Sequence, residues 1–539
     1  MFNVCLIQPP IADFYATRIR HIPLGLLSIG AALKAEHRVH LLDLRQGKSR
    51  PCPVPIELQS AADYYRAADA SPFGLYKRYA RYGATAEETA VRLPADTEIF
   101  LIAALFTTYV HEVLEILPPI KEKCPQARII IGGSGALSHT NTFFQAGADF
   151  IIAGEGEIAV LRLLEELQQP ARDFAAVPNL IWQKSGKVIH NPISFIKTLD
   201  ELPFPDYSLP ITAEYMLNGK RHAMLMTSRG CPHRCEFCAI HSLFGERYRL
   251  RSVPNVLTEL SEKIQQGFRS FDFEDDHFGG NRRWLDDLLD GIAVNFGGYE
   301  LSFQAMNGIT VTNLDKSILT KMKQVGFTEL NLSLVTPDRR RQDILQRPFS
   351  TQQFTDVVQS AHKTGLKTTA YLIIGLPGDS PDDNLQAILD LARLPVLIGP
   401  SLFYLVPGTP LFDRLKRQNA IPESPRCYRS SYFSYERPGF PRTSAMTLFR
   451  ICRIINFLKA AREYCYKPSV YQIQDRAVIL PENLSGKQSR ITLGFALLEI
   501  LKERGILYGT AKKRNGRYPL HPEVVDDSLL NRFRRQFLL

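Results

Sequence analysis

Three cysteines stand close together in the segment SRGCPHRCEFCAI, at Cys231, Cys235 and Cys238. Thiolates at this C-x3-C-x2-C spacing can ligate three corners of a cuboidal [4Fe-4S] cluster, whereas a fully ligated cluster needs a fourth cysteine. One iron would keep an open coordination position, which a catalytic metal site requires and a structural site avoids. The alternative is a zinc site with His233 or His241 as a further ligand, although no second C-x2-C pair exists.

The cysteines follow the first of six strand-like segments that alternate with helical patterns. These segments are residues 223–227, 271–274, 301–305, 329–335, 368–374 and 402–406. Strand–helix units repeated over residues 223–410 predict a partial (β/α)6 barrel rather than the closed eight-unit form. Ligands of such barrels bind at the carboxyl ends of the strands, which is where the cysteines lie.

The first 170 residues predict a separate α/β domain. Near-continuous apolar runs such as VCLIQ, RVHLLDL and RIIIGG alternate with helical patterns at residues 24–35 and 110–123. Apolar strands separated by helices indicate a doubly wound parallel sheet, covered on both faces. Residues 47–96 interrupt this rhythm and predict an insertion with short helices of its own, a kind of segment that is often functional.

The other boundaries follow from composition. The Pro-rich and acidic segment LDELPFPDYSLP predicts a linker over residues 171–222. Residues 411–539 are expected to form a mixed C-terminal region that faces a substrate or a partner. Within it, MTLFRICRIINFLKAAREY predicts an amphipathic basic helix that caps a core rather than binding a membrane.

The composition is that of a globular protein. Of 539 residues, 45% are hydrophobic and 22% are charged. No window approaches the length of uncharged apolar sequence that a membrane-spanning helix needs, and the start MFNVCLIQPP does not resemble a signal peptide, so we expect a cytoplasmic protein. The remaining six cysteines are scattered singly, as buried free thiols usually are. They are Cys5, Cys52, Cys124, Cys427, Cys452 and Cys465.

The net charge of +10 comes from one end of the chain. Residues 441–539 contain 18 basic and 8 acidic side chains, whereas the first 440 residues contain 47 of each sign. This basic region could attract an acidic partner, anionic lipid or nucleic acid, or it could be an ordinary solvated surface.

The cysteine segment resembles that of the radical S-adenosylmethionine (SAM) superfamily, with Phe237 as the aromatic residue before the third cysteine. The segment FDFEDDHFGGN is similar to the acidic second-strand motif, LIIGLPGDSPDD to the fifth-strand GxPG segment, and YLVPGTPLFDRL to the sixth-strand ending of the elongator/methylthiotransferase-like subgroup. On the fourth strand, LSLVT replaces the familiar G-x-E-S pattern. The resemblance implies a [4Fe-4S] cluster and SAM, with SAM contacts at Phe237, Glu274, Asp275, Asp276, Ser333, Gly375 and Pro377.

The N-terminal domain resembles the cobalamin-binding domain of many radical SAM enzymes in IQPP, LIAALFTT, IIIGG and AGEGE. This implies cobalamin contacts at Pro9, Pro10, Leu105, Thr107, Gly132, Gly133, Gly154, Glu155 and Gly156. The D-x-H-x-x-G motif that supplies a lower cobalt ligand is absent, and His21 does not fit its spacing. We therefore expect cobalamin without a protein imidazole below the cobalt. The alternatives are another nucleotide-like ligand, or a domain that has lost its ligand.

Together the two resemblances imply a cobalamin-dependent radical SAM methyltransferase acting on an unactivated carbon. In such enzymes one SAM methylates cobalamin, and a second is cleaved to a 5′-deoxyadenosyl radical. One alternative is a cobalamin-assisted rearrangement, ring contraction or cyclisation without net methylation. The other is an RNA- or protein-modifying enzyme that uses its basic C-terminal region, although no RNA-binding motif that combines aromatic and basic residues is evident.

The expected partners follow from the same resemblance. They are a small-molecule or peptide substrate and an electron donor such as flavodoxin or ferredoxin. Substrate contacts are expected from the insertion, from the strand-end residues Gln304 and Asn307, and from the region after Leu411.

Overall fold

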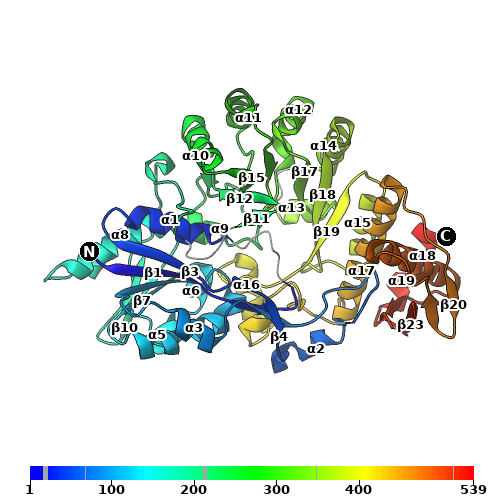
Figure 1. The fold of residues 1–539 in the computed structure, drawn as a ribbon, viewed down its shortest axis with the longest axis horizontal. Helices are drawn as coiled ribbons and strands as arrows, with labels where there is room; N and C mark the ends of the chain where they lie inside the picture. Colours follow the sequence, from blue (N-terminus) through cyan, green and yellow to red (C-terminus); the bar gives the residue numbers. More distant parts are fainter. Residues whose placement is uncertain (16–21, 67, 210–214, 347–348, 514) are drawn as a thin grey trace.

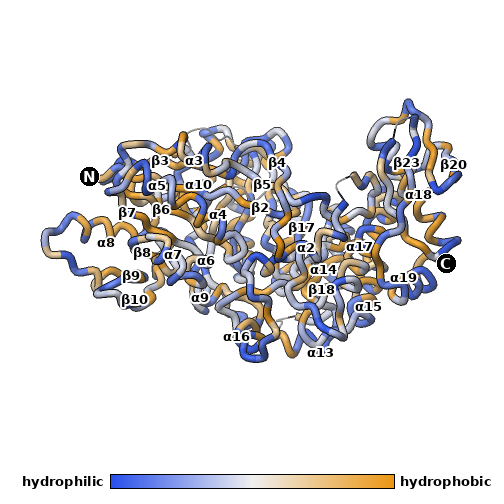
Figure 2. The backbone as a smooth tube through the Cα atoms, turned by 90° about the horizontal axis from the view of Figure 1, so that it is seen from below, coloured by the Kyte–Doolittle hydropathy of each residue, from blue (hydrophilic) through white to orange (hydrophobic). Residues whose placement is uncertain are grey.

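The computed structural model describes residues 1–15, 22–66, 68–209, 215–346, 349–513 and 515–539. It is a mixed α/β structure, as the sequence predicts. Figure 1 shows an N-terminal domain in blue and cyan, a barrel of strands and helices in green and yellow, and a C-terminal lobe in orange and red. In Figure 2 the N-terminal domain and the C-terminal lobe lie at opposite ends of the long axis.

The N-terminal domain is built on a sheet of order β10-β9-β8-β7-β6-β1-β3 among the described residues. Its parallel strands are β1 (Asn3–Gln8), β3 (Arg38–Asp43), β6 (Ile99–Ala103), β7 (Arg128–Gly132) and β8 (Phe150–Ile152). The strand order reverses between β1 and β6. In open α/β sheets, ligands bind outside the carboxyl ends of the strands at this point.

Helices cover both faces of the sheet, which confirms the doubly wound prediction. One face packs on α1 (Leu24–Leu33) and α8 (Glu157–Gln168), through residues such as Leu27 and Leu163. The other face packs on α4 (Val110–Leu114), α5 (Leu117–Lys123) and α7 (Thr140–Gln145). A short helix, α6 (Ser134–Ser138), begins directly after β7.

Part of the predicted linker belongs to the N-terminal sheet instead. Strands β9 (Leu180–Lys184) and β10 (Lys187–His190) form a hairpin, and β9 pairs antiparallel with β8. The two residues between them, Ser185 and Gly186, have φ of 50° and 75°. Two residues of positive φ favour the tight turn that matches the twist of a hairpin, so the Ser-Gly pair was the sequence signal that the linker prediction missed.

The insertion joins the N-terminal domain to the C-terminal lobe. Its strands β4 (Ser49–Pro51) and β5 (Ala80–Tyr82) form a small sheet with β2 (Ile11–Asp13), and it contains α2 (Gln59–Ala62) and α3 (Ala86–Arg92). An isolated bridge pairs Asp69 with Ala511 of the lobe. The insertion is therefore packed on both sides rather than projecting as a free loop.

The second region is the predicted partial barrel. Its main strands are β12 (Lys220–Leu225), β15 (Phe268–Phe273), β16 (Ser302–Gln304), β17 (Glu329–Val335), β18 (Lys367–Ile374) and β19 (Leu397–Leu402), with β11 (Met216–Leu217) at the edge. The bridges Phe303↔Phe327 and Ile309↔Leu332 connect its two sheets. The last strand ends at Leu402, so the strand predicted at residues 402–406 was misplaced by about one strand length. The reason is that the apolar run PVLIGPSLFYLV extends beyond the part that pairs with β18.

Helices follow the barrel strands on the outside of the barrel. They are α10 (Val253–Gln265), α11 (Arg282–Phe296), α12 (Lys316–Val325), α14 (Thr351–Thr364) and α15 (Pro381–Ala392). The short helix α13 (Arg339–Ile344) follows β17 and instead contacts the loop after β18, through Arg341 and Asp379. Side-chain caps fix several starts; for example, Ser350 and Ser380 both form capping boxes. Gly326 and Gly365 end α12 and α14 in the left-handed conformation.

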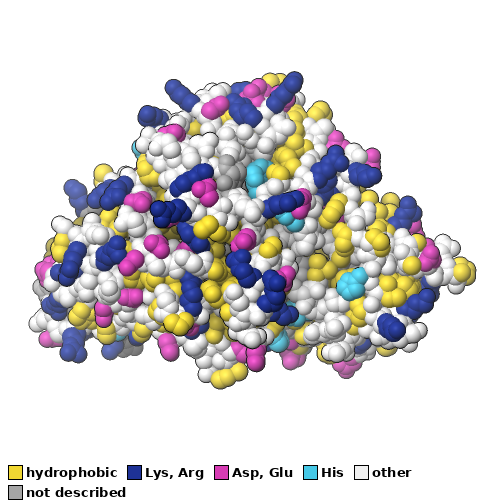
Figure 3. All heavy atoms as spheres, turned by 180° about the vertical axis from the view of Figure 1, so that it is seen from behind, with side chains coloured by type: hydrophobic (Ala, Val, Ile, Leu, Met, Phe, Trp, Pro, Cys, Tyr) yellow, Lys and Arg dark blue, Asp and Glu magenta, His cyan; other side chains and the backbone are white. Residues whose placement is uncertain are grey.

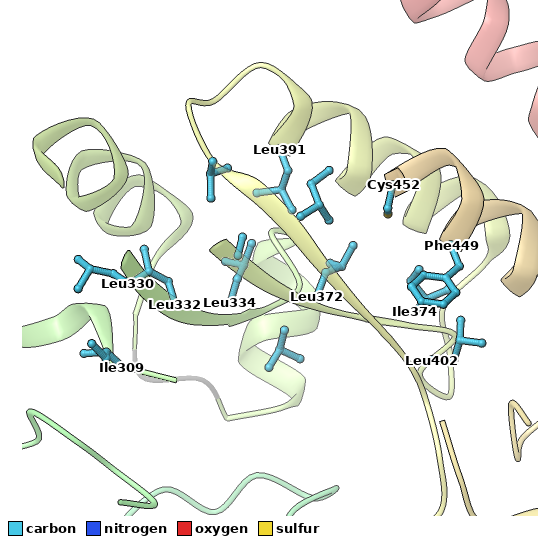
Figure 4. Close-up of a cluster of buried hydrophobic side chains, with 14 of the residues drawn as sticks. Ile309, Leu330, Leu332, Leu334, Leu372, Ile374, Leu391, Leu402, Phe449 and Cys452 are labelled. Carbon is cyan, nitrogen blue, oxygen red and sulfur yellow. The ribbon is translucent and has the colours of Figure 1, made fainter. Parts of the chain in front are cut away.

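The open side of the barrel is closed by α17 (Arg442–Glu463). Figure 4 shows Phe449 and Cys452 of this helix near Ile374, Leu391 and Leu402 of the barrel. All five side chains are buried. The basic helix predicted from the sequence is therefore a core-capping helix, and none of the described helices combines the length and apolar character that a bilayer crossing needs.

The C-terminal lobe follows α16 (Pro410–Arg417) and α17. A sheet of order β20-β21-β23-β22 packs on the long helix α18, and the chain ends near α19. The elements are β20 (Gln472–Gln474), β21 (Ala477–Ile479), α18 (Gly486–Arg504), β22 (Tyr508–Thr510), β23 (Arg517–Pro522) and α19 (Asp527–Phe533).

Part of the positive charge of this region is internal. Arg450 is 1% exposed and pairs with Glu523, and Lys459 donates to the carbonyls of Leu391, Leu394 and Val396 at 2.6–2.8 Å. On the face drawn in Figure 3, basic and acidic side chains are interspersed. Arg450 and Lys459 therefore serve the interior of this region rather than its surface.

Buried His222 makes the stability of the barrel depend on pH. Its Nδ1 lies 2.9 Å from Ser270 Oγ across β12 and β15, and burial lowers its pKa from 6.5 to about 4. The unfolded chain takes up this proton at a higher pH than the folded chain does. We therefore expect about 3 kcal/mol of stability to be lost as the pH falls from 6.5 towards 4.

Urea unfolding of His222→Gln and the native protein across this pH range measures the contribution. The native protein should lose stability more steeply as the pH falls, because other titrating groups are common to both proteins. Equal slopes for the two proteins would contradict the assignment to His222.

Candidate active site

The three cysteines lie in one closed loop at the mouth of the barrel. Strands β13 (Ser228–Arg229) and β14 (Arg249–Leu250) pair antiparallel at its base, and α9 (Ile240–Phe244) lies within it. We call residues 230–248 the cluster loop. Gly230 has a φ of 81°, and a Cβ there would lie 2.5 Å from the Arg247 carbonyl oxygen, so the loop needs glycine just before Cys231.

The thiols of this loop influence one another electrostatically. Burial, with a smaller contribution from the neighbouring Cys238 and Cys235, raises the pKa of Cys231 to about 11. The backbone N–H of Cys238 donates to the Cys235 carbonyl at 3.1 Å. A metal that binds thiolates would replace the protons on these sulfurs, so the donor set fits a cluster ligated by three cysteines.

Two histidines near Cys231 offer a different metal site. The ligand atoms of Cys231, His233 and His277 all lie within 4.8 Å of one another, and the two imidazoles contact edge to face. His241, the other fourth ligand considered from the sequence, instead places Nε2 2.8 Å from the Cys231 carbonyl oxygen. Among the described residues, Cys231, His233 and His277 could therefore bind a single metal ion instead of a cluster. Such a site would not require Cys235 or Cys238.

Two acidic residues after β15 hold the cluster loop. The Asp275 carboxylate is fully buried and accepts from the Thr227 N–H at 3.1 Å, the Thr227 hydroxyl at 2.7 Å and the Ser228 hydroxyl. Asp276 accepts from the Gly230 N–H at 3.2 Å. Burial raises the pKa of Asp275 to about 6 and that of Asp276 to about 7.

One carboxylate of the acidic motif therefore bonds to neighbouring protein groups. The Asp275 carboxylate bonds to the Thr227 N–H and to the hydroxyls of Thr227 and Ser228, so it fixes the start of β13. Glu274 is half-buried at the end of β15, where its carbonyl accepts from Asn307 Nδ2 at 2.9 Å. Gln304 Nε2 lies 3.3 Å from Asp272 Oδ2. Gln304 and Asn307 therefore both bond to residues at the carboxyl end of β15.

The other residues expected to contact SAM are placed on several elements. Phe237 is half-buried in the cluster loop, and Ser333 is half-buried near the end of β17. The register of β17 shifts between Ser333 and Val335, and Val335 has a φ of 70°, which is rare for a β-branched residue. The departure from G-x-E-S thus coincides with a bulge. The Pro377 carbonyl accepts from Arg341.

Gly375 makes room for protein rather than for a ligand. It has a φ of 84°, and a Cβ there would lie 2.4 Å from Phe433, whose side chain is completely buried. The Arg437 guanidinium donates to the carbonyls of Gly375, Leu376 and Asp379 at 2.8–3.3 Å. The glycine signal in GLPG is therefore explained by packing of the C-terminal region.

The sequence-predicted residues of the N-terminal domain gather at one sheet edge. Pro9 and Pro10 follow β1, and Leu105 and Thr107 follow β6, on the two sides of the point where the strand order reverses. Leu105 is 45% exposed, and the hydroxyl of Thr107 lies 3.3 Å from that of Ser138. His21 lies outside the described residues.

The glycines after β7 and β8 have different surroundings. Gly133 has a φ of 108°, and a Cβ there would lie 2.7 Å from the Ala104 carbonyl oxygen. A Cβ on Gly132 would meet nothing closer than 3.8 Å. Gly154 lies beside the Leu243 carbonyl, at 3.0 Å from a Cβ position, and Gly156 lies beside Ile29. The bend after β7 therefore depends on glycine at position 133.

A cavity of about 740 Å³ opens at this edge and reaches the cluster loop. Three of its walls come from different parts of the chain: α6, the end of the cysteine segment, and the stretch from α16 to residue 428. Its lining includes Ser134, Ser138, His139, Ala239, Phe412 and Tyr428. Nε2 of His139 is buried with no hydrogen-bond partner among the described residues, and burial lowers the pKa of this imidazole. No sequence motif pointed to this residue.

A second buried contact missed by the sequence motifs joins the N-terminal edge to residues 425–440. The Arg429 guanidinium lies 3.1 Å from the Asp13 carboxylate and donates to the Ala12 carbonyl at 2.9 Å. The hydroxyls of Tyr109 and Ser431 also donate to Asp13, at 2.9 and 2.7 Å. An isolated Asp and Arg about 400 residues apart give no pattern that could have revealed this pair.

Glu155 faces the barrel. Its side chain is fully buried and forms ion pairs with Arg229 at 2.8 Å and with Arg249 at 2.9 Å. Both arginines lie at the base of the cluster loop. The Glu155 carboxylate therefore belongs to the junction of the two domains, and the cobalamin contacts expected at Gly154, Glu155 and Gly156 stay a prediction.

Residues 225–391 match the family model described as the radical SAM superfamily. An uncharacterized methyltransferase of Pyrococcus horikoshii is 29% identical over 247 residues, which cover 46% of this chain and 52% of that protein. A cytidylyl-2-hydroxyethylphosphonate methyltransferase of Streptomyces wedmorensis is 24% identical over 476 residues, which cover 77% of this chain and 83% of that protein. The chain spans about half the length of the first curated relatives, at 52%, 41% and 54%.

Among solved structures, the fold is similar to that of TsrM from Kitasatospora setae. TsrM is a radical SAM methyltransferase whose structures contain tryptophan with a SAM analogue, or cobalamin with a [4Fe-4S] cluster. The first structure matches with a TM-score of 0.62 and 17% identity, and covers 84% of this chain and 89% of that one. The likeness extends over the N-terminal domain as well as the barrel, and at this identity it concerns the fold alone.

Substitutions separate a cluster from a single-ion site. Cys235→Ala and Cys238→Ala should each abolish the iron–sulfur absorption that anaerobic reconstitution gives, because each removes a cluster ligand. His277→Gln should keep it, and buried Cys452→Ala is the matched control, since this thiol lies in α17 far along the chain.

Iron, sulfide and zinc analysis of the same samples completes the comparison. Zinc retained by Cys235→Ala and Cys238→Ala but lost from His277→Gln would contradict a cluster and favour the single-ion site.

Proposed function

We propose, starting from the radical SAM domain that residues 225–391 form, that the chain is a cobalamin-dependent radical SAM methyltransferase acting on an unactivated carbon. The observation that carries this proposal is the shared cavity. Its walls come from the cysteine segment and from the ligand-binding edge of the N-terminal sheet. Two cofactors held at these edges would face one substrate space.

Cys231, Cys235 and Cys238 would hold the cluster, and Glu274 and Asp276 would accept from the SAM ammonium. When bound, the cluster supplies one electron that cleaves the sulfonium of SAM and yields a hydrogen-abstracting radical. The protein provides position and exclusion of water. Asp275 and the Gly230 turn fix the loop, and α16 covers it, since Arg414 pairs with Glu236 at 2.9 Å and the Leu411 N–H donates to the Glu236 carbonyl at 3.1 Å.

The carboxyl edge of the N-terminal sheet would hold cobalamin. Its glycine turn would let a large cofactor tail approach the backbone closely, beside the roughly 740 Å³ cavity. When bound, cobalamin supplies the methyl group for transfer to carbon. Ser134, Ser138 and His139 offer polar groups in the cavity, and the absence of D-x-H-x-x-G still favours cobalt without a lower imidazole ligand.

The substrate is proposed to be a small molecule or peptide that binds in the shared cavity, whose lining includes Phe412 and Tyr428 from the region after Leu411. An electron donor such as flavodoxin or ferredoxin would reduce the cluster. The interspersed surface charge and the buried arginines of the C-terminal lobe give no specific support for nucleic-acid binding.

SAM with a deuterated methyl group tests the reaction. After anaerobic reconstitution with iron, sulfide and hydroxocobalamin, a reductant should yield 5′-deoxyadenosine and S-adenosylhomocysteine in equal amounts, together with deuterated product, because one SAM is cleaved and one donates methyl. Mass spectrometry reads all three. A product of unchanged mass, with 5′-deoxyadenosine alone, would favour the rearrangement alternative.

Two glycines of the N-terminal domain test the cobalamin site. Gly133→Ala should lower cobalamin affinity at least about tenfold, because the new Cβ collides with the Ala104 carbonyl at the sheet edge. Gly25→Ala, at an exposed position of α1 where a Cβ has room, should bind cobalamin like the native protein. Titration followed by visible absorption measures both, and equal affinities in the two variants would place cobalamin elsewhere.

A further inference from the structure

The base of the cluster loop carries a buried charge network contributed by two domains. Arg229 of β13 and Arg249 of β14 come from the barrel. Glu155, after β8, and Glu157, the first residue of α8, come from the N-terminal domain. None of the four side chains is more than 10% exposed.

Each arginine is held by carboxylate and backbone acceptors. Arg229 donates to Glu155 at 2.8 Å and to Glu157 at 2.5 Å. Arg249 donates to Glu155 at 2.9 Å, and its other terminal nitrogen donates to the Phe244 carbonyl at 2.8 Å, within the cluster loop. Glu155 also accepts from the Ile196 N–H at 2.8 Å. The two positive and two negative charges balance.

The register of the loop base explains why this network is needed. Arg229 and Arg249 are direct partners in the β13–β14 ladder. Like charges directly opposite each other destabilise a strand pair, and their burial makes the repulsion stronger. Glu155 and Glu157 offset this repulsion, and they belong to the other domain.

The position of Arg229 transmits this constraint to the cluster ligands. Only Gly230 separates Arg229 from Cys231, and Gly230 is confined by the carbonyls of Phe244, Gly245 and Arg247. A shift of Arg229 would therefore move Cys231. On the other side, Glu155 lies between Gly154 and Gly156, at the sheet edge that is proposed to bind cobalamin.

We propose that Glu155 and Glu157 are positioning residues for the iron–sulfur cluster, which act through Arg229 and Arg249. The N-terminal domain thereby sets the geometry of the cluster loop as well as holding its own ligand. This inference rests on the proposed cluster, and it assigns to the acidic residues of AGEGE a role in the barrel.

Glu155→Gln and Glu157→Gln test this assignment in the full-length reconstituted protein, because glutamine keeps the size of the side chain but removes the charge. Asp13→Asn is the matched control. It removes a carboxylate from another buried pair between domains, Asp13–Arg429, which does not contact the cluster loop. Circular dichroism and thermal melting show whether each variant folds.

We expect both glutamate variants to lose iron to a chelator about tenfold faster than the native protein, as is typical when outer partners of metal ligands are removed. The midpoint potential of the cluster and its EPR spectrum with SAM should also change. Asp13→Asn should lower the melting temperature but leave the potential and the spectrum unchanged. A role in stability alone would give the glutamate variants the same profile as this control.

The outcomes distinguish failure of the proposed function from failure of the positioning role. If the native protein builds no iron–sulfur cluster, the proposed function fails. If the native protein builds one, and folded Glu155→Gln and Glu157→Gln retain its potential, spectrum and chelator resistance, the cluster assignment stands and the positioning role is overturned. If both variants fail to fold, Glu157→Asp, which keeps the charge, must restore folding and the native spectrum, or the positioning role is rejected.

Discussion

Buried ion pairs between distant segments hold the functional edges of this protein against each other. Glu155 and Glu157 meet Arg229 and Arg249 on one side of the junction, and Asp13 meets Arg429 on the other. A buried charge that loses its partner is strongly destabilising, whereas a well-packed apolar replacement can be neutral or better. These pairs therefore do less for net stability than for relative position, since they penalise arrangements in which the partners separate.

The N-terminal sheet, the barrel and the cysteine loop could be predicted because they depend on local patterns. Apolar runs alternate with helical periods, and three cysteines lie within eight residues of one another. The hairpin at residues 180–190 was missed because the Pro-rich segment after it dominated the interpretation. The end of β19 was misplaced because the apolar run PVLIGPSLFYLV does not show which half pairs with β18.

The roles of single site residues were harder to predict because motifs specify residue types and not their neighbours. Asp275 and Glu155 both lie where the motifs indicated, yet their carboxylates bond to Thr227, Ser228 and two arginines. Gly375 was expected to approach a ligand, but Phe433 fills that space. In each case a residue distant in sequence provides a protein contact that the motif alone could not indicate.

The Asp13–Arg429 pair also has a consequence for the order of assembly during synthesis. The first partner leaves the ribosome early, and the second follows only after more than 400 further residues have been made. The N-terminal domain can fold in the meantime, since its own strands lie within the first 190 residues. The carboxyl edge of its sheet thus stays uncovered by the Arg429 segment during most of translation and is accessible until that segment is made.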